Sequence, residues 1–168
     1  MTLPPNARLA RVVLDGEALT RLSPILEADR AQAVADLTVD SHFAPLVAPL
    51  AANPEASGPG PYELRLSVWE GRLVFDVRHL DGGKAMLLGL ALGPFRRLIK
   101  DYQLLVESHI KAVEEGREAR IQAIDMGRRG LHDEGAALMC QRLDGKIAID
   151  FATARRLFTL VCVLHTRG

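Results

Sequence analysis

Short segments in the first part of the chain alternate apolar and polar residues, which is the period of a strand with one buried face. Apolar side chains recur at every second position in residues 62–68, 73–77 and 86–92. The dipeptide Glu70-Gly71 lies between the first two runs and predicts a short hairpin turn. Residues 8–14 form a fourth expected strand.

The second part of the chain carries helical patterns and has no proline after Pro94. From Pro94 to about Gly116 apolar residues recur every three or four positions, and a second helical segment covers about residues 118–143. A last helix is expected to begin at Asp150 as its N-cap, and residues 157–164 are apolar on every side except at Thr159. A helix that is apolar all round is buried all round.

These patterns predict an α+β fold with a small antiparallel sheet of three to four strands. The sheet is expected to pack against the C-terminal helical half, with the last helix buried at its centre. In the first half, Ser23-Pro24 predicts the start of one more helix, which extends to about Val39. The length of 168 residues fits a single domain, 1–168. Residues 44–61 contain five prolines and predict a Pro-rich surface loop.

Composition narrows the class of protein. Hydrophobic residues make up 48% and charged residues 25%, values typical of a globular protein and not of a disordered tail or a fibre. Lys plus Arg equals Asp plus Glu at 21 each, so no overall field favours nucleic acid or a membrane. We see no signal peptide in the first 20 residues and no apolar run near the ~20 residues of a membrane span. These observations predict a cytoplasmic protein with no membrane contact. Cys140 and Cys162 both lie in apolar stretches, which indicates buried thiols.

Residues 124–135 are unusual because they place three glycines inside a helical pattern. Each glycine in a helix interior costs roughly 1 kcal/mol relative to alanine. Either another helix approaches closely, or the helix breaks at Gly127 or Gly130 and presents the neighbouring arginines on a turn. The sequence leaves both alternatives open.

Several long motifs carry a resemblance to a known family. The segments IDMGRRGLH, GPFRRLIKDY and DFATARRLFTLVCVLHTRG, together with RLVFDV in the expected hairpin, closely resemble an uncharacterised family of alphaproteobacteria, number 262 of the UPF series. The resemblance covers most of the chain. It implies a bacterial protein, and it implies no activity, catalytic residue or cofactor, because the family has none assigned.

Three arginine doublets stand out in the recognisable segments. Arg96 and Arg97 are expected within the first turn of their helix, where the helix dipole disfavours cations by about 0.3–1 kcal/mol each. Compensating anions could be internal carboxylates, with Asp101, Asp125 or Asp150 as candidates, or a ligand phosphate or carboxylate. The predicted anion-binding set consists of these six arginines: Arg96, Arg97, Arg128, Arg129, Arg155 and Arg156.

A second constellation offers acid–base chemistry. His132 follows Asp125 by seven residues, so the two could share a helix face as a general base and the carboxylate that orients it. The alternative is a solvated face of mixed charge. His109 falls on an apolar stripe and is expected to be a core histidine. We find no metal-ligand spacing such as HExxH or CxxC, so the sequence predicts no metal and no cofactor.

The first functional hypothesis is a non-enzymatic binding or regulatory protein that contacts an anionic partner through the arginines. The partner would be an anionic metabolite, RNA or an acidic protein surface. The alternative is a small enzyme that uses Asp125 and His132 beside the arginine cluster. A third interpretation is a homo-oligomer or scaffold that buries an exposed apolar surface.

Overall fold

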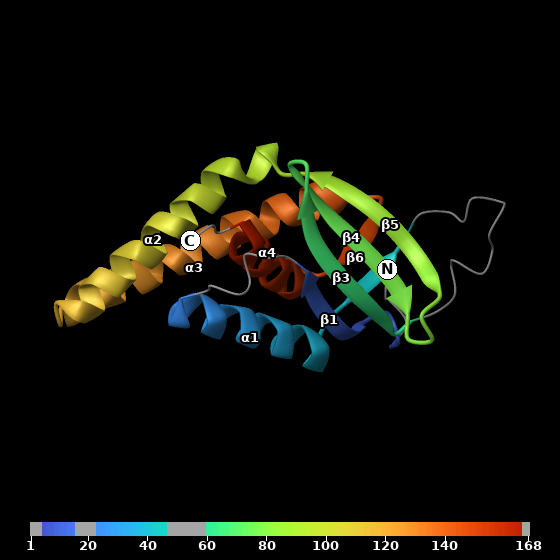
Figure 1. Ribbon diagram of the computed structural model, residues 1–168, viewed down its shortest axis with the longest axis horizontal. Coiled ribbons are helices and arrows are strands. Elements are labelled where there is room, and N and C mark those ends of the chain that lie inside the picture. The colour runs from blue at the N-terminus through green and yellow to red at the C-terminus, as the bar shows by residue number, and fades with distance from the viewer. Residues whose placement is uncertain (1–4, 16–22, 47–59, 166–168) are drawn as a thin grey trace.

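A four-stranded sheet forms one end of the molecule (Figure 1). The computed structural model describes residues 5–15, 23–46 and 60–165. The strand order is β1-β3-β4-β5, and the strands are β1 (Leu9–Asp15), β3 (Tyr62–Trp69), β4 (Arg72–His79) and β5 (Lys84–Ala91). The alternation along the sequence therefore predicts each of these strands.

Cross-strand register places the apolar residues on one face. Leu64 lies opposite Val77 and Leu66 opposite Phe75, and all four side chains are fully buried. Glu70 and Gly71 make the hairpin turn with positive φ angles of 50° and 73°. Such angles match the right-handed twist of the two strands that the turn connects.

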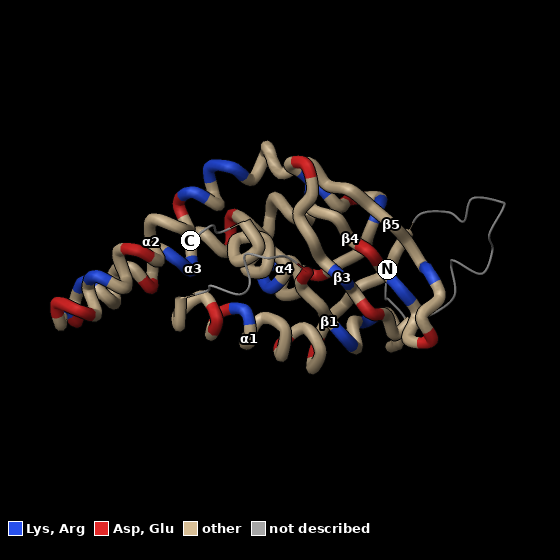
Figure 2. The backbone as a smooth tube through the Cα atoms, in the orientation of Figure 1, with Lys and Arg blue, Asp and Glu red and all other residues tan. Residues whose placement is uncertain are grey.

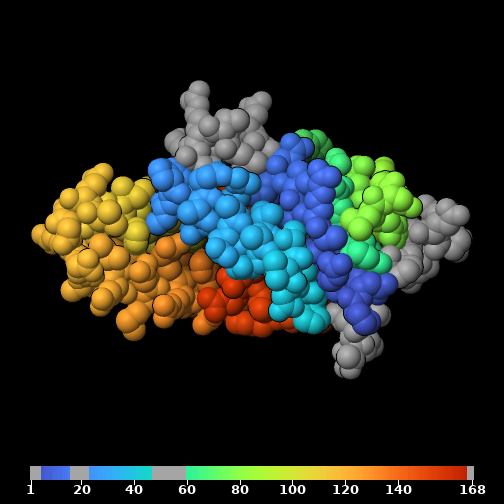
Figure 3. Space-filling view, turned by 90° about the horizontal axis from the view of Figure 1, so that it is seen from below, coloured from blue at the N-terminus to red at the C-terminus, as the bar shows by residue number. Residues whose placement is uncertain are grey.

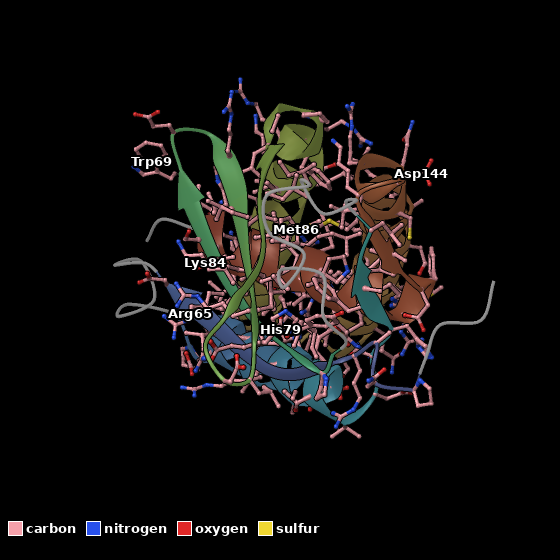
Figure 4. The ribbon with its side chains drawn as sticks, turned by 90° about the vertical axis from the view of Figure 1, so that its right-hand side faces the viewer. Arg65, Trp69, His79, Lys84, Met86 and Asp144 are labelled. Carbon is pink, nitrogen blue, oxygen red and sulfur yellow. The ribbon has the colours of Figure 1, made fainter. Side chains whose placement is uncertain are left out.

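The opposite face of the sheet is turned away from the helices. Arg65 and Trp69 lie on this face, because the odd-numbered residues of β3 point away from the buried Leu64 and Leu66 (Figure 4). Trp69 is 68% exposed at the end of the β3–β4 hairpin. An antiparallel sheet with one solvated face commonly shows this pattern.

The sheet differs from the expected antiparallel one in the direction of β1, which pairs in parallel with β3. Parallel neighbours need a crossover connection, and helix α1 (Pro24–Val39) is part of the chain between these two strands. The sheet is therefore mixed. Alternation predicts which face of a strand is buried but says nothing about the direction of its neighbour.

A second, two-stranded sheet joins β2 (Phe43–Pro45) to β6 (Ile147–Ile149) in antiparallel register. The sequence does not predict it, because three residues are too few to show a period. Ala44 and Pro45 of the expected Pro-rich loop belong to β2. Residues 47–59 of that loop lie outside the described residues.

The helices of the second half begin and end close to the predicted positions. They are α2 (Arg96–Glu114), which follows the 3-10 turn η3 (Gly93–Phe95), α3 (Glu118–Leu143) and α4 (Phe151–His165). Asp150 is the N-cap of α4 as predicted, since its Oδ1 accepts a hydrogen bond from the Thr153 N–H at 2.9 Å. Ser23 accepts from the Leu26 N–H in the same way at the start of α1.

Helix α4 occupies the centre of the molecule, as expected. All residues from 157 to 164 are buried, and the helix packs against α1, α2, α3 and β3 (Figure 1). Helices α2 and α3 pack against each other and extend as a pair past α4 and α1 (Figure 3). We call the projecting part of this pair, residues 107–123, the arm. Within the described part of the chain, no helix combines the length and apolar character needed to cross a membrane.

Candidate functional site

A polar cluster lies where α1, α2 and α3 meet. Asp29 of α1 accepts two hydrogen bonds at its Oδ2 atom, one from the Tyr102 hydroxyl at 2.5 Å and one from the Arg128 guanidinium. The side chains of Arg128 and Asp29 are only 15% and 20% exposed. A charged pair removed from water this far needs good geometry and hydrogen bonds to stabilise the fold. Asp29, Arg128 and the Tyr102 hydroxyl together join α1, α3 and α2.

His132 of α3 lies beside this cluster, between two aromatic rings. Its ring centroid is 6.0 Å from that of Tyr102 and 6.0 Å from that of Phe158, which it meets edge-on. Its Nε2 atom is 3.4 Å from the Thr159 hydroxyl oxygen. That hydroxyl donates its hydrogen to the Arg155 carbonyl at 3.2 Å, so a neutral His132 donates to Thr159 through Nε2.

Burial and nearby arginines set the charge of these groups. Burial, and then the positive charge of Arg128, lower the pKa of His132 to about 4. Burial and the negative charge of Asp29 raise the pKa of Tyr102. At neutral pH both rings are uncharged. A general base works best when its pKa is near the operating pH, so this environment does not favour His132 as a base.

Asp125 and His132 share a side of α3 but do not meet, and no hydrogen bond or ion pair joins them within the described residues. Seven residues of helix rise about 10.5 Å, which is too far for the two side chains to reach each other. Asp125 lies instead 3.8 Å from His109 Nε2 and 3.9 Å from the Arg128 guanidinium. His109, expected in the core, is half-buried at this contact.

The arginine doublets mostly find carboxylates of the same chain. Arg97 contacts Asp101 at 3.3 Å and Glu134 at 3.4 Å. The other pairs are Arg155 with Asp133 at 3.0 Å, Arg156 with Asp36 at 3.1 Å, and Arg128 with Asp29. Four of the six arginines therefore have the internal partners that the sequence allowed as one alternative. Arg96 and Arg129 are exposed and have no ion pair with another described residue.

Most of these carboxylate partners escape sequence reasoning. Asp101 and Asp125 are the exceptions, since Asp101 lies four residues after Arg97 and Asp125 three residues before Arg128 on the same helix. Asp150, another candidate, caps α4 and contacts His42 Nδ1 at 2.7 Å. Asp29 and Arg128 are 99 residues apart, and no local signal in the sequence connects them.

The described residues contain no group of three His, Cys, Asp or Glu side chains that could hold a metal ion. Cys140 is half-buried on α3 and Cys162 is buried in α4. Burial raises the pKa of the Cys162 thiol well above its usual value, so this thiol is not a thiolate at neutral pH.

Comparison with known proteins identifies relatives along the whole chain. The model of an uncharacterised protein family, UPF0262, matches residues 6–167. The chain belongs to this family. A UPF0262 protein of Granulibacter bethesdensis is 67% identical over 162 residues, covering 96% of this chain and 92% of that protein. UPF0262 proteins of Acidiphilium cryptum and Xanthobacter autotrophicus are 58% and 44% identical, covering 97% and 98% of this chain and 95% of each relative. No solved structure matches the chain.

The glycines of α3 in this UPF0262 protein have unequal surroundings. The helix is continuous through all three glycines, so it does not break at Gly127 or Gly130. The other explanation is that a neighbouring group approaches closely at each glycine. A Cβ atom at Gly135 would lie 2.4 Å from the Phe158 ring, so only glycine fits there. At Gly127 the added atom would touch Leu105 at an ordinary 3.6 Å, and at Gly130 it would meet no atom of the described residues within 4 Å.

An open groove runs between α2 and α3 of the UPF0262 protein, with a cavity volume of about 490 Å³. Leu104 stands at this groove with 51% of its surface exposed. The residues that line the groove are Asp101, Leu104, Leu105, Gly127, Gly130, Leu131 and Glu134. The first turns of α2 beside it carry Arg96, Arg97 and Lys100, all exposed. We call these three residues the basic cluster.

Proposed function

We propose that this UPF0262 protein is a non-enzymatic binding protein that contacts an acidic protein surface through the basic cluster on α2. The observation that carries this proposal is that Arg96 and Lys100 form no ion pair with another described residue, and the first turn of α2 contains no acidic residue. Three cations thus lie at the end of a helix whose dipole already favours anions.

The internal ion pairs define which arginines are available. Arg97 is 71% exposed, and its two carboxylate partners are also partly exposed to solvent. Arg96 and Lys100 have no ion pair with another described residue. Arg128 is held by Asp29 inside the fold, so it would reach a ligand only by giving up that partner. Arg129, Arg155 and Arg156 of the predicted set lie on α3 and α4, and the latter two have carboxylate partners of their own.

Charge and apolar contacts together favour an acidic protein surface over RNA. Residues 94–168 carry 13 basic and 10 acidic side chains, an excess too small for a phosphate-backbone site. The exposed side chain of Leu104 lies one turn after Lys100 and adds an apolar contact. A protein partner can satisfy both features.

The test measures the binding of a fluorescein-labelled poly-glutamate peptide by anisotropy, with a single-stranded RNA of equal charge beside it. The variant Arg96→Gln/Lys100→Gln is expected to bind the peptide at least tenfold more weakly, with a smaller dependence on salt. Arg72→Gln/Lys84→Gln on the exposed part of the sheet is the matched control and is expected to stay within twofold of the unmodified protein.

Equal peptide affinity for all three proteins would overturn the proposal. Tighter binding of the RNA than of the peptide, lost in the α2 variant, would overturn the choice of an acidic protein as partner. Circular dichroism checks that both variants are folded, since exposed charges change stability by less than about 1 kcal/mol.

A further inference from the structure

The groove between α2 and α3 exposes apolar surface that the described chain does not cover. Leu104, which lines the groove, is half exposed. Leu105 and Leu131 form the inner wall beside the two glycines. A hollow with leucines on its wall and no side chain on its floor suits the ridge of another helix.

Gly127 and Gly130, which line the groove, have no close packing against other described residues that would require a glycine. Gly135 is required by Phe158, but Gly127 and Gly130 leave room for a larger residue. Each costs about 1 kcal/mol of helix stability relative to alanine. A helix that approaches from outside would use the space that these two positions keep open.

The charges along α2 indicate what that helix is. Residues 96–101 carry three basic side chains and one acidic one, whereas residues 107–115 carry three acidic side chains and one basic one. In Figure 2 the basic cluster lies at the start of α2 and the acidic end lies toward the tip of the arm. A second copy of α2 running in the opposite direction places each end against its complement.

We propose that the α2–α3 groove is the interface of a two-fold symmetric homodimer, in which two α2 helices pack antiparallel. Pairing centred between Leu104 and Leu105 sets position 96 opposite position 113 and position 100 opposite position 109. The basic cluster then neighbours Glu114, Glu115 and Glu107 of the second copy. Leu104 of each copy lies over Gly130 of the other. Such an interface is self-complementary, as closed two-fold symmetry requires.

This inference rests on the proposed function, because it names the acidic partner as the arm of a second copy. The two can fail separately. A protein that stays monomeric yet still binds poly-glutamate through Arg96 and Lys100 would overturn the dimer and leave the proposed function standing. A protein that dimerises without contribution from these two residues would overturn this interface, while the proposed function is decided by the poly-glutamate assay.

The experiment measures mass in solution by sedimentation velocity over a range of concentrations. The unmodified chain of 18.4 kDa is expected at twice its mass. Arg96→Glu/Lys100→Glu makes positions 96, 100, 107 and 114 of α2 all acidic, and Glu107→Lys/Glu114→Lys makes the same four positions all basic. Each variant alone is expected to be a folded monomer, because its like charges repel across the two-fold axis.

The decisive measurement is made on a mixture of the two variants. The charges at positions 96, 100, 107 and 114 are then opposite across the axis, so a heterodimer is expected with a dissociation constant near that of the unmodified protein. Variants that dimerise alone, or a mixture that stays monomeric, would overturn the proposal. This design needs no assumption about folding, since the mixture restores what each variant loses.

A steric variant tests the groove itself. Gly130→Leu fills the hollow on an exposed helix face and is expected to raise the dimer dissociation constant at least tenfold while the monomer stays folded. Gln141→Leu, exposed near the other end of α3, is the matched control and is expected to leave the constant unchanged. An unaltered dimer in Gly130→Leu would contradict the placement of the interface.

Discussion

The two halves of α3 place the same residue type in opposite situations. From Leu131 onward the helix lies against α4, and its buried residues are Leu131, Gly135, Ala136, Met139 and Leu143. Before that point only Ile124 is buried. Gly135 leaves room for the Phe158 ring, while a Cβ atom at Gly130 would meet no atom of the described part of the chain within 4 Å. A glycine in a helix pattern therefore does not by itself show close packing: Gly135 is required by a neighbouring ring, and Gly130 is not.

The boundary between these halves is marked by charge and not by packing alone. Arg128 reaches α1 and His132 lies between the rings of Tyr102 and Phe158, one turn apart on α3. The half of α3 from Leu131 onward is stabilised by apolar burial. The half before Leu131 contains Arg128, whose ion pair with Asp29 joins α3 to α1. The following variants separate these contributions.

The largest effect is expected from α4, against which α3 packs from Leu131 onward. Phe158 is fully buried and packs against Phe95 and His132, so Phe158→Ala should lower the free energy of unfolding by about 3–5 kcal/mol. Urea denaturation followed by circular dichroism measures this loss. Phe151→Ala, half exposed at the start of the same helix, is the control and should lose about 1 kcal/mol or less. Similar losses in the two variants would contradict the central position of α4.

The boundary pair comes next. Arg128→Ala leaves Asp29 buried with only the Tyr102 hydroxyl, and the expected loss is about 2–4 kcal/mol. Its neighbour Arg129 is exposed, so Arg129→Ala should change stability by about 0.5 kcal/mol or less. The same denaturation experiment compares them. Equal effects would show that the ion pair adds nothing to the fold.

The pH dependence of stability tests His132. Its pKa is about 4 in the folded protein against 6.5 when exposed, so below pH 6.5 the unfolded chain binds a proton that the folded chain does not. Its contribution to stability is therefore complete above pH 6.5 and is lost as the pH falls toward 4. The expected loss is roughly 2–3 kcal/mol.

His132→Gln removes this titration, so the difference in unfolding free energy between the two proteins should shrink as the pH falls from 7 to 4.5. Asp150, whose pKa is lowered, titrates below this window and is present in both proteins. A constant difference across the range would contradict the burial of His132.

The smallest changes in stability are expected for two glycines of α3. Gly135→Ala forces a methyl group against the Phe158 ring and should cost about 1–3 kcal/mol. Gly127→Ala, with ordinary contact to Leu105, should stabilise the helix by up to about 1 kcal/mol. Thermal unfolding of the two variants, measured side by side, should shift in opposite directions. Midpoints that shift in the same direction would contradict the different packing of the two halves of α3.

Local periodicity predicts the helices and the β3–β4–β5 strands because each is set by neighbours in sequence. The start of α3 at Glu118, its end at Leu143 and the cap at Asp150 all follow from local pattern. The parallel pairing of β1 and the three-residue strands β2 and β6 do not, because direction and partner are decided by contacts across the fold.

The polar cluster shows the same limit at the site. Tyr102 fits the apolar stripe of α2, and nothing in its surroundings in the sequence indicates Asp29, which is 73 residues away. The spacing of Asp125 and His132 indicates a shared side of α3 correctly but not the distance along the axis. Pairing within one helix is predictable, as for Arg97 and Asp101, whereas pairing between helices requires the fold.

The β2–β6 pairing has a consequence for how the protein is made. Phe43 pairs with Ile149, and the nearby His42 N–H donates to Thr153 across 111 residues of sequence. At synthesis rates of about 5–20 residues per second, the early segment waits roughly 5–20 s for this partner to be translated. Until then Phe43, fully buried in the finished fold, has no partner strand. Closing such a long loop also slows folding. The β2–β6 pairing can therefore form only after residues 147–149 have been translated.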